Sequence, residues 1–235
     1  SPEFIADLDR TMSQARLSRY LTAAAGDIDS ALALYEKNVL LSEALFGFLH
    51  GLEVTVRNSM HFVFSGDLRT ADWYQDGLAL PWLPPTRRRL SMTRSMRGMI
   101  EDARAKAGPT APVGKVIAEL TFGFWPAMIG NRFDDIWRKS LYKAFPHTRE
   151  RRQIVHWRLD TIRFLRNRIA HHEPILSSTN EIYTGHLAQP KISLPAILQC
   201  VEWVSPPTAD WLRTTTRYEQ ALTILAEVVG SGLTL

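Results

Sequence analysis

The segment from Phe164 to Ile175, Phe-Leu-Arg-Asn-Arg-Ile-Ala-His-His-Glu-Pro-Ile, concentrates side chains that could do chemistry. Asn167 and His171 are four residues apart, so they share one face of a helix. We expect this helix to end close to His172, because a proline two residues later disfavours helical geometry before it. The negative end of the helix dipole favours a protonated His171, which suits it to acid–base work near neutral pH.

Arg166 in the same segment directs a charge toward an apolar face. At about 100° per residue, it falls within the stripe formed by Val155, Leu159, Ile162 and Ile169. A buried guanidinium without a partner costs several kcal/mol, so Arg166 must meet a carboxylate, a substrate phosphate or a groove between two subunits.

The same residues also fit an ordinary polar helix face. Arg163 and Asp160 lie on that face one and two turns before Asn167, and the histidine pair could be no more than a charged helix end. The five-residue offset between Arg166 and His171 separates their side chains by about 140° on an ideal helix. A shared site therefore requires the Arg166 side chain to wrap around the helix, or the last turn to unwind.

Helical periodicity runs through nearly the whole chain and predicts an all-α fold. The strongest apolar stripe lies between Leu41 and Val63, where we expect the core, and Asp27 is a suitable cap for that helix. Loops are expected over 67–85 and 177–195. The predicted helices span 5–25, 27–64, 86–107, 113–121, 133–144, 148–172, 194–204 and 208–229.

The composition is that of a soluble globular protein, with 235 residues of which 45% are hydrophobic and 22% charged. The lone Cys200 excludes a disulfide within the chain and fits a reducing compartment, so we expect a cytoplasmic protein. No secretion signal begins the chain, and residues 1–4 resemble a cloning scar. No apolar run approaches the roughly 18 residues of a membrane helix. We expect residues 5–235 to form a single domain without membrane contact.

The basic residues are concentrated in two runs. The formal net charge is +4, from 28 Lys+Arg against 24 Asp+Glu. One run lies between Arg87 and Lys106, and the other lies between Arg149 and Arg168. Both suggest an anionic partner, although arginines that merely solvate helix faces would give the same pattern.

The residues around the histidine pair resemble the Abi-like (abortive infection) family of bacterial proteins, within the HEPN superfamily of helical ribonucleases. The string from Arg166 to Ile175 matches the family's signature and contains the HEPN Arg-x4-His pattern at 166–171. Upstream, the Leu-Glu-Val-Thr-Val-Arg-Asn string at 52–58 and the aromatic blocks between Phe124 and Pro146 are also similar to the family. The resemblance covers about residues 38 to 176 and implies a HEPN-like helical bundle with additional helices.

The resemblance implies a metal-independent endoribonuclease that acts as a toxin or antiphage effector. Such an enzyme uses the 2′-hydroxyl of RNA as nucleophile, so the protein helps to move protons and stabilises the phosphorane charge. Carried onto this sequence, the resemblance assigns phosphate binding to Arg166, acid–base catalysis to His171 and positioning to Asn167. HEPN enzymes typically dimerise with both motifs in one cleft, so we expect a homodimer, and the resemblance also allows a protein or RNA antitoxin as partner.

Several neighbours are candidates for supporting roles. His172 could assist catalysis or only close the helix end, and we favour the structural role. Glu53 and Arg57 could form an ion pair that orients the site or an ordinary surface pair, and their fit to the family favours the supporting role. His61 is interpreted as a core or surface residue. The candidate RNA-binding residues are Arg163, Arg168, Arg87, Arg88, Arg89 and Arg94.

Two other functions fit the same residues. One is a non-catalytic RNA-binding module, and the other is a helical toxin subunit regulated by an antitoxin. The sequence carries no zinc-protease, Walker, dinucleotide-binding or serine-hydrolase motif, so we expect no metal and no cofactor. Aromatic side chains that could stack on bases are interpreted as packing residues; they are Trp73, Tyr74, Trp82, Phe124 and Trp125.

Overall fold

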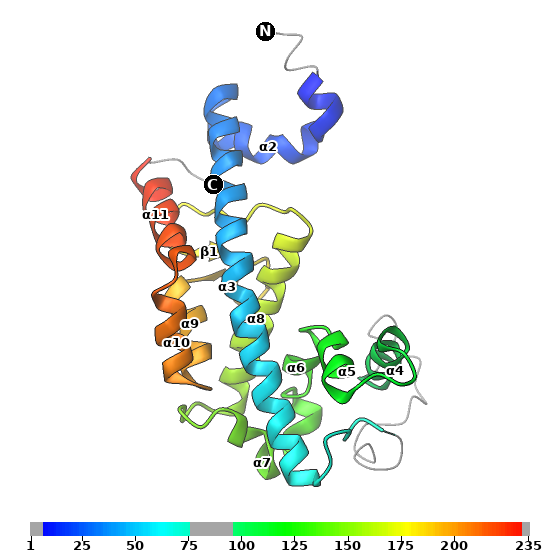
Figure 1. The fold of residues 1–235 in the computed structure, drawn as a ribbon. Helices are drawn as coiled ribbons and strands as arrows, with labels where there is room; N and C mark the ends of the chain where they lie inside the picture. Colours follow the sequence, from blue (N-terminus) through cyan, green and yellow to red (C-terminus); the bar gives the residue numbers. More distant parts are fainter. Residues whose placement is uncertain (1–6, 76–95, 232–235) are drawn as a thin grey trace. The chain divides into compact units, whose positions relative to one another are not determined.

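A computed structural model of the chain describes residues 7–75 and 96–231. These residues form helices and one two-stranded sheet, which confirms the all-α fold class (Figure 1). The elements are η1 (Asp9–Ser13), α2 (Gln14–Ala23), α3 (Ile28–Leu68), α4 (Met96–Ala107), α5 (Val113–Glu119), α6 (Phe124–Ala127), η2 (Asn131–Phe133), α7 (Asp134–Lys139), η3 (Leu141–Ala144), α8 (Arg152–Ala170), β1 (Ile182–Tyr183), β2 (Lys191–Ile192), α9 (Leu194–Glu202), α10 (Pro206–Arg213) and α11 (Thr216–Gly230).

The described residues group into two compact units. The first unit contains residues 7–49, 164–197 and 211–231, and the second contains 50–75, 96–163 and 198–210. The histidine pair and its flanking residues lie in the first unit, whereas the string at 52–58 lies in the second.

The long helix α3 begins as the sequence predicts. The backbone N–H of Ser30 donates a hydrogen bond of 2.9 Å to the Asp27 carboxylate, which confirms Asp27 as the cap. Leu41 and the apolar residues that follow it on the predicted stripe are buried, except that Val63 is only half-buried and the next residue, Phe64, is buried instead.

The expectation that no apolar run is long enough to cross a membrane is wrong for α3. This helix of 41 residues meets the requirement by length and composition, with a mean hydropathy of 1.5 in its most apolar window, 39% of which is buried. Core helices of soluble proteins meet the same requirement. The helix is continuous in Figure 1, because none of its glycines interrupts the hydrogen bonding.

In the first unit, α2 packs on the beginning of α3 through a small apolar cluster. Tyr20 and Ala24 of α2 are buried against Ala31 and Leu34 of α3, and the ring of Tyr20 meets Tyr35 edge-on at 5.5 Å. This contact fixes the position of α2 on α3.

The second unit has an aromatic core. The ring of Trp73 lies 6.2 Å from Phe124 and 5.1 Å from Phe64, and Trp125 meets Phe124 edge-on. Trp73, Tyr74, Phe124 and Trp125 are all buried, which confirms that they are packing residues, whereas Trp82 lies outside the described residues. Helix α4 packs beside α5 in this unit (Figure 1).

Three predicted segments differ from the structure. The helix expected over 133–144 changes to a 3₁₀ turn after Ser140, and the loop expected over 177–195 contains the hairpin β1–β2, in which buried Ile182 pairs with buried Ile192. The helix expected over 208–229 is two helices, α10 and α11. The hydroxyls of Thr214 and Thr215 donate to backbone carbonyls three residues earlier, at 2.8 and 2.7 Å, and so compete with the helical bonds.

Candidate active site at the end of α8

Helix α8 presents the predicted stripe to the core. Val155, Leu159 and Ile162 are fully buried and Ile169 is 6% exposed. Arg166 lies among them and is half-buried, as expected for a guanidinium whose alkyl stem packs while its charge reaches a partner.

The end of α8 is a Schellman turn. The N–H of His172 donates to the carbonyl of Ile169 at 3.0 Å, and the N–H of Glu173 donates to the carbonyl of Arg168 at 2.9 Å. His172 has a φ of +56°, in the left-handed region where glycine is normally found. The prediction that the helix stops here is therefore confirmed, and the backbone of His172 makes the turn.

Arg168 holds this turn together. Its Nε and Nη2 donate to the carbonyl of Pro174 at 3.1 and 2.8 Å, and its Nη1 pairs with the carboxylate of Glu173 at 2.7 Å. The side chain is only 18% exposed. Arg168, predicted as an RNA contact, is thus occupied by the chain's own backbone and by Glu173.

The hairpin β1–β2 packs against the Arg168 side chain. The guanidinium lies 4.8 Å from the ring centroid of Tyr183, and a Cβ placed on Gly185 would come within 2.9 Å of Nη1. Gly185 also has a φ of +72°, so the backbone geometry favours glycine there, and a Cβ would displace the guanidinium of Arg168. Phe164 of α8 meets His186 of the hairpin edge-on at 4.9 Å.

Asn38 fixes the segment that leaves the turn. Its side-chain oxygen accepts hydrogen bonds from the backbone N–H groups of Ile175 at 2.8 Å and Leu176 at 3.4 Å. Asn38, in the first third of α3, is only 4% exposed, and both of its partners are buried. A buried amide that satisfies two buried donors is a structural anchor, because those donors have no access to water.

The last turn of α8 stays helical up to His171. The backbone N–H of His171 donates to the carbonyl of Asn167 at 2.9 Å, an i to i−4 bond. Asn167 is half-buried, and His171 and His172 are exposed. Since the turn does not unwind, Arg166 and His171 leave the helix on different sides, and a shared site requires either a wrapped Arg166 side chain or a second chain.

Two arginines of α2 that are not among the predicted site residues approach this turn. Arg16 donates from Nη1 to the carbonyl of His172 at 3.3 Å, and the guanidinium of Arg19 lies 5.0 Å from the ring centroid of Tyr183. Burial raises the pKa of the Tyr20 hydroxyl to about 12, against the opposing effect of Arg19, Arg16 and Arg168. Their spacing on α2 is visible in the sequence, but their contact with residues more than 150 positions away is not.

The predicted supporting residues of α3 lie in the second unit. Glu53 and Arg57 are half-buried, and Arg57 donates from Nε to the side-chain oxygen of Asn58 at 3.2 Å. His61 accepts a hydrogen bond of 2.9 Å from the indole N–H of Trp73. Burial, with a smaller effect of Arg57, lowers the pKa of His61, so it remains neutral and serves the aromatic core.

Several arginines of the second basic run bind the chain itself. Arg152 donates to Asp134, to the side chain of Asn131 and to the carbonyl of Ile129 at 2.7–2.9 Å. Arg158 lies over the ring of Trp203 at 5.9 Å. This run is therefore not a uniform basic surface.

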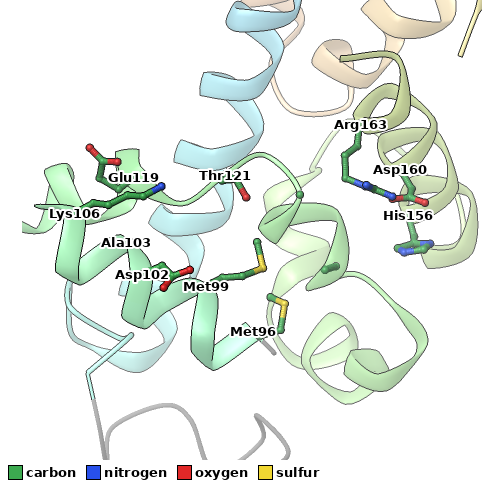
Figure 2. A pocket seen from close by; sticks show the side chains of 12 residues that line it. Met96, Met99, Asp102, Ala103, Lys106, Glu119, Thr121, His156, Asp160 and Arg163 are labelled. Carbon is green, nitrogen blue, oxygen red and sulfur yellow. The ribbon is translucent and has the colours of Figure 1, made fainter. Parts of the chain in front are cut away.

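Arg163, a predicted RNA contact, faces a pocket in the second unit. It pairs with Asp160 at 2.6 Å, and its stem packs over Gly123. Figure 2 shows this pair and His156 on α8, opposite residues of α4 and α5. The pocket holds about 410 Å³ and is lined by Met96, Met99, Asp102, Ala103, Lys106, Glu119, Thr121, Gly123, Ala127, His156, Asp160 and Arg163.

The remaining predicted RNA contacts, Arg87, Arg88, Arg89 and Arg94, lie outside the described residues. Within residues 7–75 and 96–231, no group of three or more His, Cys, Asp and Glu side chains is arranged to hold a metal ion.

Comparison with known proteins gives one match. Residues 10–177 match the family model described as Abi-like protein. No curated protein and no solved structure matches the chain. The matched region begins before α2 and ends after the segment anchored by Asn38, so it contains every residue of the turn described above.

Proposed function

The chain belongs to the Abi-like family, and from this premise we propose that it is a metal-independent endoribonuclease of the HEPN type. Membership of this family points to a role in abortive infection or defence. We place the enzyme in the cytoplasm, where it would act as a toxin or antiphage effector on cellular or phage RNA.

The observation that carries the proposal is the position of His171. The histidine is exposed at the C-terminal end of a helix whose following turn is locked by Arg168, with Arg166 in the preceding turn. An accessible imidazole on a rigid support is suited to proton transfer, and a half-buried guanidinium is suited to phosphate binding.

The proposed reaction is an in-line transesterification. His171 assists the proton transfers as the 2′-oxygen attacks the adjacent phosphorus and the bond from phosphorus to the 5′-oxygen breaks. The proton lost by the 2′-hydroxyl is balanced by the proton gained by the leaving 5′-oxygen, so the products are a 2′,3′-cyclic phosphate and a 5′-hydroxyl. Arg166 stabilises the charge that develops on the phosphorane, and Asn167 orients the site.

A homodimer resolves the separation of Arg166 and His171 on α8. With the last turn intact, two chains that bring their helix ends into one cleft can combine Arg166 of one with His171 of the other. Mixing an Arg166→Gln protein with a His171→Ala protein tests this arrangement. Sites shared between chains should recover about a quarter of the wild-type activity in a random mixture, whereas sites within one chain should recover none.

The decisive experiment compares wild type with His171→Ala and Arg166→Gln on a mixed pool of single-stranded and structured RNA in EDTA. We expect wild type to produce 2′,3′-cyclic phosphate ends and both variants to lose them, with unchanged circular dichroism. His147→Ala, which removes an exposed histidine of the second unit, is the matched control and should cleave normally.

Three outcomes would overturn the proposal. Cleavage that requires Mg²⁺, or that proceeds equally on DNA, would contradict 2′-hydroxyl attack. RNA binding without cleavage would favour the non-catalytic module. If His147→Ala lost cleavage to the same extent as His171→Ala, the assignment of His171 as the acid–base residue would be refuted.

A further inference from the structure

Helix α2 places two arginines beside the turn that follows α8, where Arg168 adds a third. Arg16 and Arg19 reach this turn and its neighbour Tyr183, as does Arg168 from α8. No acidic residue occurs in the sequence between Asp9 and Asp27, so α2 supplies no carboxylate of its own. The carboxylate of Glu173, next to the histidine pair, is paired with Arg168.

The distances bring Arg19 close to Arg168, whose charge is paired with Glu173. The guanidinium carbons of Arg19 and Arg168 lie 5.0 and 4.8 Å from the same ring centroid, so they are at most about 10 Å apart. That is close to the Debye length of about 8 Å at physiological salt, so salt screens their repulsion only in part. An anion bound between or beside them would relieve the repulsion.

The contacts that hold Arg16 and Arg19 are also weak. Arg16 is exposed, and its bond to the carbonyl of His172 is 3.3 Å long and uses one of the five N–H donors of a guanidinium. Arg19 is half-buried and reaches a ring that Arg168 already contacts. Neither contact uses the full hydrogen-bonding capacity of an arginine. Arg16 lies at the backbone of His172 itself, and Arg19 lies at Tyr183, the ring that Arg168 also contacts.

We propose that Arg16 and Arg19 of α2 form a second phosphate subsite, which binds the RNA backbone next to the scissile phosphate. This inference rests on the proposed ribonuclease function and adds to it a substrate-binding element from the N-terminal part of the chain. The subsite recognises phosphate and is indifferent to base identity, because guanidinium groups bind phosphate oxygens, which carry no sequence information.

Salt dependence provides a readout that a merely structural role would not change. Each phosphate contact to a single strand contributes about 0.7 to the slope of log affinity against log salt concentration. Loss of two contacts should reduce that slope by about 1.4, so the loss of affinity between about 50 and 200 mM salt becomes about sevenfold smaller.

The experiment measures fluorescence anisotropy of a short labelled single-stranded RNA in the His171→Ala background, so that cleavage does not interfere. We expect Arg16→Gln/Arg19→Gln to weaken binding and flatten the slope, and Arg16→Lys/Arg19→Lys to restore most of the slope because the charge is kept. Arg217→Gln, which removes an exposed arginine of α11 in the same unit, should leave the slope unchanged.

The two proposals fail differently. If wild type cleaves RNA but the double glutamine variant has the parental salt slope, or the lysine variant behaves like the glutamine variant, the subsite is refuted and the ribonuclease stands. If RNA binds with the expected change in slope but is never cleaved, the ribonuclease fails while the phosphate subsite stands. If no RNA binds at low salt, the subsite is refuted.

Discussion

Replacement of His172 by glycine should stabilise the protein, whereas replacement by alanine should not. His172 has a φ of +56° at the end of α8, and a left-handed conformation costs a residue with a Cβ about 1–2 kcal/mol. Glycine escapes this cost but loses about 0.5–1 kcal/mol more than alanine in chain entropy. We therefore expect His172→Gly to raise the free energy of unfolding by about 0.5 kcal/mol.

Alanine keeps the backbone strain and removes the same imidazole, which makes it the matched control. The hydrogen bond from Arg16 ends on the backbone carbonyl of residue 172, so both variants retain it. The glycine variant should melt about 1–2 °C above wild type, and the alanine variant at or below wild type. Thermal unfolding followed by circular dichroism, with urea denaturation as a check, measures both differences.

The same pair of variants separates a structural His172 from a catalytic one. If the residue only closes the helix, both proteins cleave RNA at the wild-type rate. A loss of rate that is equal in the two variants would show that the imidazole takes part in catalysis. An alanine variant as stable as the glycine variant would refute the argument from the left-handed turn.

Four further predictions concern the framework. Asn38→Ala leaves the buried N–H groups of Ile175 and Leu176 without their acceptor, and should lower the free energy of unfolding in a urea titration by about 2–4 kcal/mol. Arg152→Met removes the charged donor shared by Asp134, Asn131 and Ile129, and should cost about 2–3 kcal/mol in the same measurement. The pKa of His61 in the folded protein lies below its ordinary value of 6.5, because burial disfavours the protonated imidazole. The stability that the neutral His61 contributes is therefore complete above pH 6.5 and is lost as the pH falls through the lowered pKa. The His61→Gln variant should lose less stability than wild type between about pH 7 and pH 5. Burial raises the pKa of the Cys200 thiol, so a thiol reagent should label the native protein only at the rate at which it unfolds, and rapid labelling without unfolding would contradict the buried position.

The sequence predicts the helix that carries the site better than it predicts what holds the site in place. The apolar stripe of α8 and the stop before Pro174 follow from periodicity and from the geometry of proline, both of which are local. The break between α10 and α11 is missed because the apolar period continues across residues 214–216, while the threonine hydroxyls that interrupt it act through individual hydrogen bonds.

The structural role of Arg168 likewise depends on contacts that the sequence does not predict. A basic run predicts charge at a surface, but the partners of this arginine are the carbonyl of Pro174, the carboxylate of Glu173 and the ring of Tyr183. Asn38 and Arg16 reach the site from positions more than 130 residues away in the sequence. The periodicity of apolar residues in the sequence does not predict such contacts, because each contact forms only when α2, α3 and the hairpin are packed.

These distant anchors explain how an exposed histidine can be held rigidly. The carbonyl of Pro174 accepts hydrogen bonds from Arg168, and the N–H groups of Ile175 and Leu176 donate to Asn38, so these two side chains hold residues 174–176. These hydrogen bonds end on backbone atoms of the turn, so substitution of a side chain at the turn leaves them in place. The last turn of α8 is thereby kept helical, and its intact geometry is what directs Arg166 and His171 to different sides of the helix. The rigidity that prepares His171 for proton transfer is thus also the physical reason to expect a second chain at the site.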